Sequence, residues 1–332
     1  MAAARYRGCG MEAALSLIEE DLKNVELQFM KDLHSNVSLI RKVTEYVFSS
    51  GGKRIRPALL LLSARLFGYR GDRHVPLASV IEFIHTATLL HDDVVDNAQL
   101  RRGIASANTL WGNEASVLVG DYLFSKSFSI MIADGDLRIL SALSAATTMI
   151  AEGEVLQLIS STDLDITEER YIDVVKSKTA ILLATACQAG AILGNASPEL
   201  EAALKSFGME LGIAFQLIDD TLDYTSSEEQ FGKSIGHDLE EGKITLPLIH
   251  TLRNCTSAER DAISEIIGMD SLLKDDFAKV FDLVHRYGGI DYSLKVAGNY
   301  IDRSKSRLDV FADSQEKSAL KSLADYIITR QR

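Results

Sequence analysis

Two groups of aspartates in this chain share one spacing. Residues 92–96 and residues 219–223 both read D-D-x-x-D. If each group lies on a helix, its first and last acids share one face and form a carboxylate pair. Like charges about 6 Å apart repel by roughly 3 kcal/mol at an effective dielectric of 20, so facing carboxylates need cations. Oxygen ligands without His or Cys suit magnesium, which usually bridges to a substrate phosphate.

One such group alone is typical of a solvated helix face. Here both groups follow apolar-rich segments, residues 81–91 and 211–218, so their charges would lie near a core. The spacing also repeats, which a random surface need not do. The pattern therefore favours two facing clusters that hold a diphosphate through shared metal ions. Its candidate acids are Asp92, Asp93, Asp96, Asp219, Asp220 and Asp223.

Basic residues that could complete such a site stand in several places. The glycines and cations of GGKRIRP, residues 51–57, favour an anion at a helix N-terminus, although an ordinary basic loop fits as well. Arg101 and Arg102 follow the first acidic group and could make bidentate phosphate contacts. His85 lies two turns before Asp92 on the same face, as either a satisfied core residue or a diphosphate contact. Further candidates, each more often a surface residue than a ligand, are Lys178, Lys233 and Lys243.

The elements that must position these residues are predicted to be helices. Only 4 prolines and 7% aromatic residues favour helices over a β-sandwich or barrel. Unbroken helical patterns run over residues 76–96, 115–132, 137–158 and 198–223. Several are apolar over most of their circumference, which is typical of central helices. Because no long linker or fixed repeat interrupts the pattern, we predict one all-helical domain over residues 11–332.

Charge and cysteine content limit the partners and the compartment. A net charge of −12 argues against nucleic acid as a partner. The three cysteines are widely separated, which indicates no disulfide framework and a reducing compartment. No apolar run approaches the roughly 20 residues that span a bilayer. We therefore expect a soluble protein without a transmembrane segment, which an apolar substrate could still bring to a membrane surface.

The first ten residues differ from the rest of the chain. They contain two arginines and no acid, which is similar to the end of an organellar transit peptide, although a tag would look the same. We expect residues 1–10 to be disordered or such a remnant. The corresponding compartment is a plastid or mitochondrion, or otherwise the cytoplasm.

Together these motifs resemble the trans-type isoprenyl diphosphate synthases. The resemblance covers about residues 42–247 and rests on GGKRIRP, HTATLLHDDVVDNAQLRRG, AEGEVLQL, SKTA and FQLIDDTLDYTSSEEQFGKSIGHDLEEGKITLPLI. It is strongest to medium- and long-chain (octaprenyl, solanesyl) synthases, which supply quinone side chains, and to related plant geranyl diphosphate synthases. It implies an isoprenoid synthase fold, with ten or more helices around a central apolar cavity, and a homodimer.

The resemblance also implies a reaction and a role for each candidate residue. An allylic diphosphate (geranyl, farnesyl or geranylgeranyl) would ionise, condense with isopentenyl diphosphate and lose a proton. About three magnesium ions would be coordinated by Asp92, Asp96 and Asp219, with Asp93, Asp220 and Asp223 in support. Isopentenyl diphosphate would be held by Lys53, Arg56, His85 and Arg102. The allylic diphosphate would be contacted by Arg101, Lys178, Thr179, Gln216, Lys233 and Lys243.

Product length is expected to depend on residues one turn before the first acidic group. Family members that stop at fifteen carbons place bulky aromatic rings there, as the resemblance implies, whereas this chain has Ala87 and Thr88. One helical turn rises about 5.4 Å, close to one extended isoprene unit, so we expect products of about C25 to C45. The floor of the tunnel is then expected at Phe124, Phe128 and Met131, although all three could instead be core packing.

Other functions remain open from the sequence alone. A short-chain (geranyl or geranylgeranyl) synthase would share all of these motifs. A class I terpene cyclase usually carries N/D-D-x-x-S/T-x-x-x-E as its second metal motif, whereas the fifth position here is Asp223. A non-catalytic partner subunit should lack one acidic group. A helical scaffold protein without a binding site would not explain why the spacing repeats.

Overall fold

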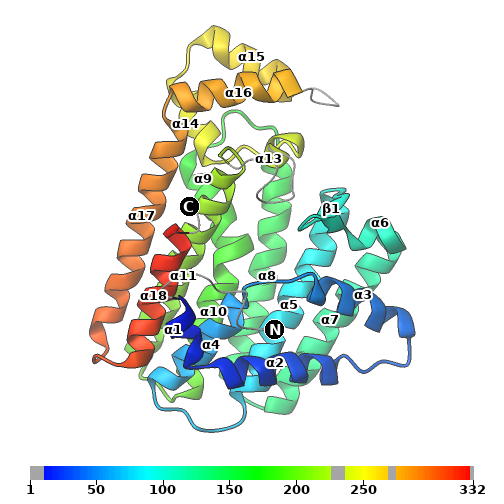
Figure 1. Cartoon of the computed structure of the whole chain (residues 1–332), viewed down its shortest axis with the longest axis vertical. Coiled ribbons are helices and arrows are strands. Elements are labelled where there is room, and N and C mark those ends of the chain that lie inside the picture. Colours follow the sequence, from blue (N-terminus) through cyan, green and yellow to red (C-terminus); the bar gives the residue numbers. More distant parts are fainter. Residues whose placement is uncertain (1–10, 226–235, 268–273, 330–332) are drawn as a thin grey trace.

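Helices make up nearly all of the regular structure. The computed structural model describes residues 11–225, 236–267 and 274–329, and in these ranges the only strands form one short antiparallel hairpin. This confirms the predicted all-helical fold (Figure 1). The predicted remnant at residues 1–10 lies outside the described residues. The first helices are α1 (Met11–Ser16), α2 (Glu19–Asp32), α3 (Ser38–Ser49), α4 (Ile55–Leu66) and α5 (His74–Val95).

The remaining elements follow in chain order. Those up to the second acidic group are β1 (Leu100–Arg101), β2 (Ile104–Ala105), α6 (Ala107–Trp111), α7 (Asn113–Asp134), α8 (Leu137–Ser160), α9 (Glu168–Val175), a π-helical turn (Lys176–Ala180), α10 (Ile181–Leu193) and α11 (Pro198–Leu222). After them come α13 (His237–Glu240), α14 (Leu246–Asn254), α15 (Ser257–Ile267), α16 (Lys274–Arg286), α17 (Gly289–Arg307), a 3₁₀ turn (Leu308–Val310) and α18 (Gln315–Thr329). The four predicted long helices are confirmed as α5, α7, α8 and α11.

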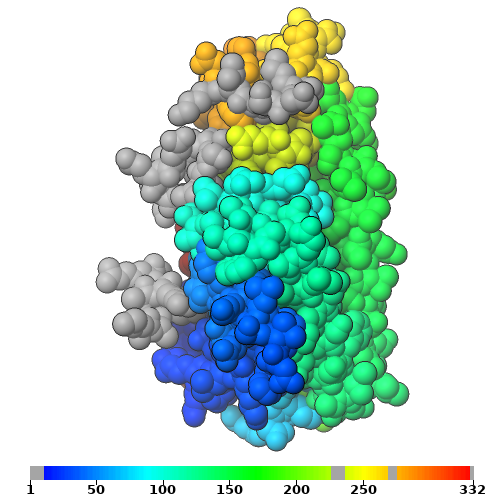
Figure 2. All heavy atoms as spheres, turned by 90° about the vertical axis from the view of Figure 1, so that its right-hand side faces the viewer, coloured from blue at the N-terminus to red at the C-terminus, as the bar shows by residue number. Residues whose placement is uncertain are grey.

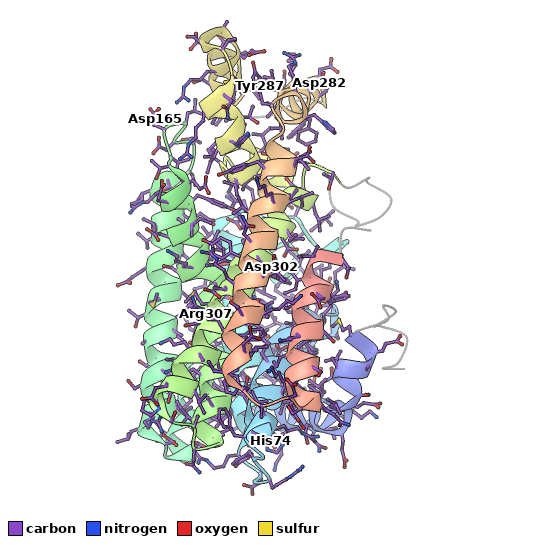
Figure 3. The ribbon with its side chains drawn as sticks, turned by 90° about the vertical axis from the view of Figure 1, so that its left-hand side faces the viewer. His74, Asp165, Asp282, Tyr287, Asp302 and Arg307 are labelled. Carbon is purple, nitrogen blue, oxygen red and sulfur yellow. The ribbon has the colours of Figure 1, made fainter. Side chains whose placement is uncertain are left out.

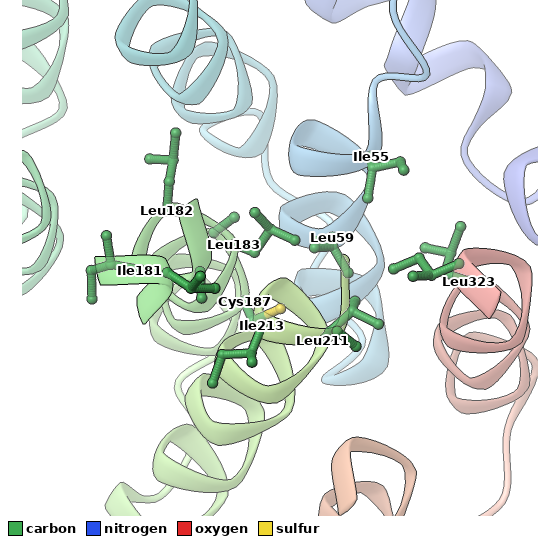
Figure 4. Packing of buried hydrophobic residues seen from close by; sticks show 14 of the residues in the cluster. Ile55, Leu59, Ile181, Leu182, Leu183, Cys187, Leu211, Ile213 and Leu323 are labelled. Atoms are coloured by element: carbon green, nitrogen blue, oxygen red, sulfur yellow. The ribbon is translucent and has the colours of Figure 1, made fainter. Parts of the chain in front are cut away.

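Helix α10 lies at the centre of the bundle. All of its residues except Gln188 are buried, because α4, α5, α8 and α11 pack around it. Glycine permits the closest of these contacts: a Cβ on Gly190 would lie 2.5 Å from the carbonyl oxygen of Leu60 on α4. Figure 4 shows the resulting core, in which apolar side chains of α4, α10, α11 and α18 meet. Burial of these side chains from water is the main force that holds the helices together.

Two long helices carry the acidic groups to one end of the bundle. α5 begins at His74, at the lower end in Figure 3, and its 22 residues rise about 33 Å toward the opposite end. α11 begins where the side chain of Ser197 accepts a hydrogen bond from the backbone N–H of Leu200, as its Ser-Pro start predicted. At the far end Lys243 lies 3.1 Å from Asp96, so the segment that follows α11 closes over the end of α5.

Helices α7 and α8 form an outer face of the molecule, coloured teal to green in Figure 2. By length and composition alone, both helices could cross a membrane. Neither helix contains an unbroken apolar run of that length, because both intersperse apolar residues with Ser, Thr or Gly and a few charges. Only 33% and 28% of their most apolar windows are buried inside the molecule. Core helices of soluble proteins pass the same length test.

Candidate active site

The first acidic group divides its side chains between two directions. Asp92 and Asp96 are partly exposed, whereas Asp93 is buried. Asp93 Oδ1 accepts a hydrogen bond from Arg101 Nε at 2.6 Å. Burial raises the pKa of Asp93, and the nearby Arg101 offsets only part of this effect. Asp93 therefore fastens the hairpin that carries Arg101 to the end of α5, and it leaves Asp92 and Asp96 to face a ligand.

The second acidic group repeats this division. Asp220 is buried and accepts hydrogen bonds from the Tyr171 hydroxyl and, at 2.7 Å, from Gln216 Nε2. Burial raises the pKa of Asp220 to about 6, although both hydrogen bonds lower it. Gln216 in turn accepts a hydrogen bond from the Thr179 hydroxyl at 2.8 Å. Asp220 is thus held among α9, the π-helical turn and α11, while Asp219 remains partly exposed.

Asp223 has surroundings unlike those of Asp96, its counterpart in the first group. Its two carboxylate oxygens accept hydrogen bonds from the backbone N–H groups of His237, at 3.3 Å, and Asp238, at 3.0 Å. These contacts satisfy the first N–H groups of α13, which is the task of a helix cap. Burial, together with repulsion from Asp220 and Asp223, raises the pKa of Asp238 well above its usual value.

Lys178 stands on the π-helical turn between α9 and α10. Turns of this kind are frequent at functional sites. α8 comes so close that a Cβ on Gly153 would lie 2.9 Å from the backbone nitrogen of Lys178. Lys178 Nζ lies 2.7 Å from Glu154 Oε2 on α8. Burial raises the pKa of Glu154 to about 7, although Lys178 lowers it.

Lys243 joins the two acidic ends of the bundle. Its Nζ lies 3.1 Å from Asp96 Oδ2 and 2.5 Å from Glu241 Oε2. Burial lowers the pKa of Lys243, but Glu241 and Asp96 raise it by more, so the net shift is upward. Lys178 and Lys243 both lower the pKa of Asp92, which burial raises. Two cations and the Asp92–Asp96 pair thus occupy one neighbourhood.

A separate basic cavity of about 680 Å³ opens beside this neighbourhood. Its lining includes Lys53, Arg56, His85, Arg102 and Asp219, with apolar residues from α3, α5, α10 and α11. Four of these five residues are those that the resemblance assigned to isopentenyl diphosphate, and they come from three separate parts of the chain. Asp219 lies where this cavity meets the acidic groups.

His85 and Arg56 are in direct contact within this cavity. Arg56 Nη1 lies 3.1 Å from His85 Nε2. Because a guanidinium can only donate, Nε2 must accept, which places the imidazole proton on Nδ1. Burial and the charges of Arg56 and Arg102 hold the pKa of His85 well below its usual value, so the ring is neutral. A neutral His85 can offer its Nδ1–H to an anion without adding a further buried charge.

The donor set fits a divalent metal shared with a phosphate. The partly exposed acids Asp92, Asp96 and Asp219 offer only carboxylate oxygens, which are hard ligands. In the described ranges no three acidic, histidine or cysteine side chains converge closely enough to hold an ion by themselves. This suits magnesium, which keeps waters and takes part of its coordination from substrate phosphates rather than from an all-protein cage.

The other predicted residues fall into three situations. Thr179 and Gln216 are engaged in the network around Asp220. Lys233 lies outside the described residues. Of the residues predicted to control product length, Thr88 is partly exposed, whereas Ala87 is buried in a cluster with Leu123 of α7. Phe124 and Phe128 of α7 are partly buried against the main core, and Met131 is fully buried.

Several residues that build the site were not foreseen. Glu154 lies in the AEGEVLQL segment, where two acids on an apolar helix were the available signal. Tyr171 gave no sequence signal, because it reaches Asp220 from 49 residues away. Arg54 was seen only as one of three loop cations, yet it forms a buried ion pair with Glu82.

Comparison with known proteins identifies relatives that share this architecture. Residues 37–284 match the polyprenyl synthetase family model. The octaprenyl diphosphate synthase of Escherichia coli (strain K12) is 43% identical, over 97% of this chain and 99% of that protein. A crystal structure of a polyprenyl synthase from Caulobacter crescentus CB15, complexed with calcium and isoprenyl diphosphate, matches with a TM-score of 0.94 at 39% identity, over 98% of this chain and all of the other. A decaprenyl diphosphate synthase from Rhodobacter capsulatus matches with a TM-score of 0.91 at 40% identity, over 96% and 98% of the two chains.

Product class and source also differ among the relatives. Those named as short-chain or geranylgeranyl diphosphate synthases are 38% identical or less. These relatives are bacterial or archaeal, which gives no support to the plastid or mitochondrial compartment that residues 1–10 suggested. The family match covers most of the chain, and the most similar relatives align over nearly its full length. The chain therefore belongs to the polyprenyl synthetase family.

Proposed function

We propose that this protein is a magnesium-dependent trans-prenyltransferase that extends an allylic diphosphate with isopentenyl diphosphate units to medium- or long-chain products of about C25 to C45. One observation carries the proposal: the partly exposed acids Asp92, Asp96 and Asp219 stand between two separate sets of cations. Lys178 and Lys243 lie on the Asp92–Asp96 side, and the Arg56–His85 cavity lies beside Asp219. A chain that binds one diphosphate needs only one such set, so this arrangement favours condensation over cyclisation of a single substrate.

The first cation set is suited to a leaving group. Lys178 and Lys243 are held at their positions by Glu154, Asp96 and Glu241 before any ligand arrives. Charges that are already oriented stabilise a departing diphosphate without reorganisation in the transition state. Magnesium, held by Asp92, Asp96 and Asp219, would when bound supply further positive charge to the diphosphate oxygens. The allylic C–O bond would then break to give a carbocation and free diphosphate.

The second set is suited to binding rather than to bond cleavage. Arg56 is partly buried, and its buried Nε has no hydrogen-bond partner in the described part of the chain. A buried donor without a partner is costly unless a ligand satisfies it, which an anion in this cavity would do. Held there, isopentenyl diphosphate would attack the carbocation through its double bond, and the proton lost afterwards would pass to the released diphosphate. The apolar walls would keep water from the carbocation.

Product analysis tests the proposal. The purified protein, incubated with magnesium, radiolabelled isopentenyl diphosphate and geranyl, farnesyl or geranylgeranyl diphosphate in turn, should form all-trans polyprenyl diphosphates. Chromatography of the dephosphorylated products gives their length. Products confined to C10–C20 with every primer would support a short-chain synthase instead. Cyclic hydrocarbons formed without isopentenyl diphosphate would support a cyclase, and no turnover with any primer would contradict the proposal.

We also propose that two copies associate through α7 and α8. The side chains of Leu118, Ile132, Leu158 and Ile159 are each more than 60% exposed on these helices. So large an apolar face is rare on the free surface of a soluble protein and marks an interaction site. A second copy fits because the face is long, carries few charges and can pair with itself about a two-fold axis.

Sedimentation and vesicle flotation separate the possible partners of this face. Leu158→Glu should convert a dimer into a monomer. Leu27→Glu, at an equally exposed leucine on α2, should leave the dimer intact. A wild-type monomer that floats with lipid vesicles would instead assign the face to a membrane surface.

A further inference from the structure

Arg54 has an unfavourable backbone conformation, which the contacts of its side chain must stabilise. It stands at the start of α4 with a φ of +49°, in the left-handed region that glycine adopts readily and other residues rarely. Two glycines precede it, so this loop already uses glycine where the backbone demands it. A non-glycine residue persists in such a conformation when its contacts over-determine it. The contacts of the guanidinium are therefore the reason for arginine here.

Each nitrogen of the Arg54 guanidinium donates to an oxygen of the protein. Nη1 lies 2.8 Å from Glu82 Oε2 on α5, and Nε lies 3.2 Å from Glu26 Oε1 on α2. Nη2 donates to the carbonyl oxygen of Phe48, at the end of α3, at 3.1 Å. The guanidinium also stacks 3.8 Å above the Phe48 ring. One side chain thus joins the loop to three helices.

The Arg54–Glu82 pair forms part of the wall of the basic cavity. Glu82 is almost fully buried and precedes His85 by three residues, about one turn of α5. Arg56, two residues after Arg54, contacts His85 at 3.1 Å. Two cross-links, Arg54–Glu82 and Arg56–His85, therefore join the start of α4 to adjacent turns of α5. All three nitrogens of the Arg54 guanidinium are engaged by the protein, whereas Arg56 Nε has no hydrogen-bond partner in the described part of the chain.

We propose that Arg54 is a positioning residue: it holds Lys53 and Arg56 at the separation that the diphosphate of isopentenyl diphosphate requires, without contacting that diphosphate. The inference rests on the proposed function. Lysine cannot reproduce the role, because one ammonium does not offer three planar donor directions. Displacement of binding groups by about 1 Å can cost on the order of 100-fold, so loss of this clamp should be visible in substrate binding.

The main test compares the two substrates in steady-state kinetics. Arg54→Met should raise KM for isopentenyl diphosphate at least about tenfold, while KM for the allylic primer and kcat at saturation stay within about threefold. Arg54→Lys should fall between Arg54→Met and wild type. The matched control is Arg65→Met at the other end of α4, where Arg65 pairs with Asp21 of α2 at 2.8 Å, far from the cavity. Arg65→Met should lower thermal stability without changing either KM.

A double variant separates positioning from neutralisation of a buried charge. Arg54→Met alone leaves Glu82 buried without its partner and should lower the thermal midpoint. Arg54→Met/Glu82→Met removes both charges and should recover most of that midpoint, while KM for isopentenyl diphosphate stays high. If the double variant recovers KM as well, Arg54 serves only to neutralise Glu82 and the inference is wrong. An equal rise in both KM values would also overturn it.

A binding measurement distinguishes failure of this inference from failure of the proposed function. Isopentenyl diphosphate alone should raise the thermal midpoint of wild type and of Arg65→Met, and should raise that of Arg54→Met much less at the same concentration. If wild type shows this shift but forms no product, the proposed reaction fails and the role of Arg54 in binding stands. If isopentenyl diphosphate shifts all three proteins equally, or shifts none, the positioning role is refuted.

Discussion

Replacement of Asp92 by Asn should make the metal-free protein more stable while it removes activity. Burial raises the pKa of Asp92, and Asp96 adds repulsion, so the charged form is held at a cost. Two carboxylates one helical turn apart repel by about 3 kcal/mol at an effective dielectric of 20, and Lys178, Arg101 and Lys243 offset part of this. We expect the neutral amide to increase the free energy of unfolding by about 1 to 2 kcal/mol, or roughly 2 to 4 °C in the thermal midpoint.

The order of stability should then reverse when ligands are added. With magnesium and a non-ionisable analogue of the allylic diphosphate at about 100 times its Kd, wild type should gain about 2.7 kcal/mol. Asp92→Asn should gain much less and should turn over at least about 100-fold more slowly. The control is Asp302→Asn, an exposed acid on α17 (Figure 3), which should change stability by less than about 0.5 kcal/mol in either condition.

Calorimetry at two pH values completes the test. Because the folded-state pKa of Asp92 is raised, its charge destabilises the fold above that pKa and the penalty disappears as Asp92 takes up a proton. The stability difference between Asp92→Asn and wild type, measured in EDTA, should therefore be largest near pH 7.5 and smaller near pH 5. A variant that is less stable than wild type in EDTA at pH 7.5 would refute the reasoning, since the charge would then be net stabilising.

Three further predictions follow from the same geometry. Lys53→Ala should raise KM for isopentenyl diphosphate about tenfold and Lys178→Ala should do the same for the allylic primer; equal effects on both substrates would contradict this partition. The Ala87→Phe, Thr88→Phe double variant should shorten the product toward about C15–C20 by chromatography, and an unchanged length in a folded variant would show that the product does not run along α5. The pKa of Glu154 is about 7, above its usual 4.5, so the folded state binds a proton that the unfolded state has released. Urea titrations without metal should therefore show stability falling by about 1 kcal/mol between pH 6 and pH 8, and Glu154→Gln should lose most of this dependence.

The long helices could be predicted because buried helices have a strong apolar pattern in their sequence. α5 and α11 are apolar over much of their circumference. Their bounds can therefore be predicted from the prolines and charged residues at their ends. The π-helical turn at Lys178 could not be predicted in this way. It depends on α8 approaching so closely at Gly153 that the backbone must adapt, and that contact joins segments 25 residues apart in the sequence. The extent of the exposed face on α7 and α8 was also missed, since polar side chains of small size interrupt its apolar runs.

Residue types at the site were easier to predict than their partners. Motif resemblance grouped Lys53, Arg56, His85 and Arg102, and all four line one cavity. The role of Asp223 was harder to foresee, because the i+4 spacing pairs it with Asp219, whereas its oxygens cap α13, which begins 14 residues later. A helical spacing defines which side chains share a face. It does not say which segment of the chain returns to meet them.

There is nevertheless a physical reason why the second residue of each D-D-x-x-D group is an aspartate. Neighbouring residues on a helix point about 100° apart, so two adjacent acids cannot both face the same ligand. In both groups the second acid turns inward and accepts a strong hydrogen bond, Asp93 from Arg101 and Asp220 from Tyr171. Each thereby ties the end of its helix to another element, where repulsion among the neighbouring carboxylates would otherwise separate the two. We therefore expect the first acid of each group to bind the metal and the second to hold the helix end in place, and the repeated spacing meets both needs.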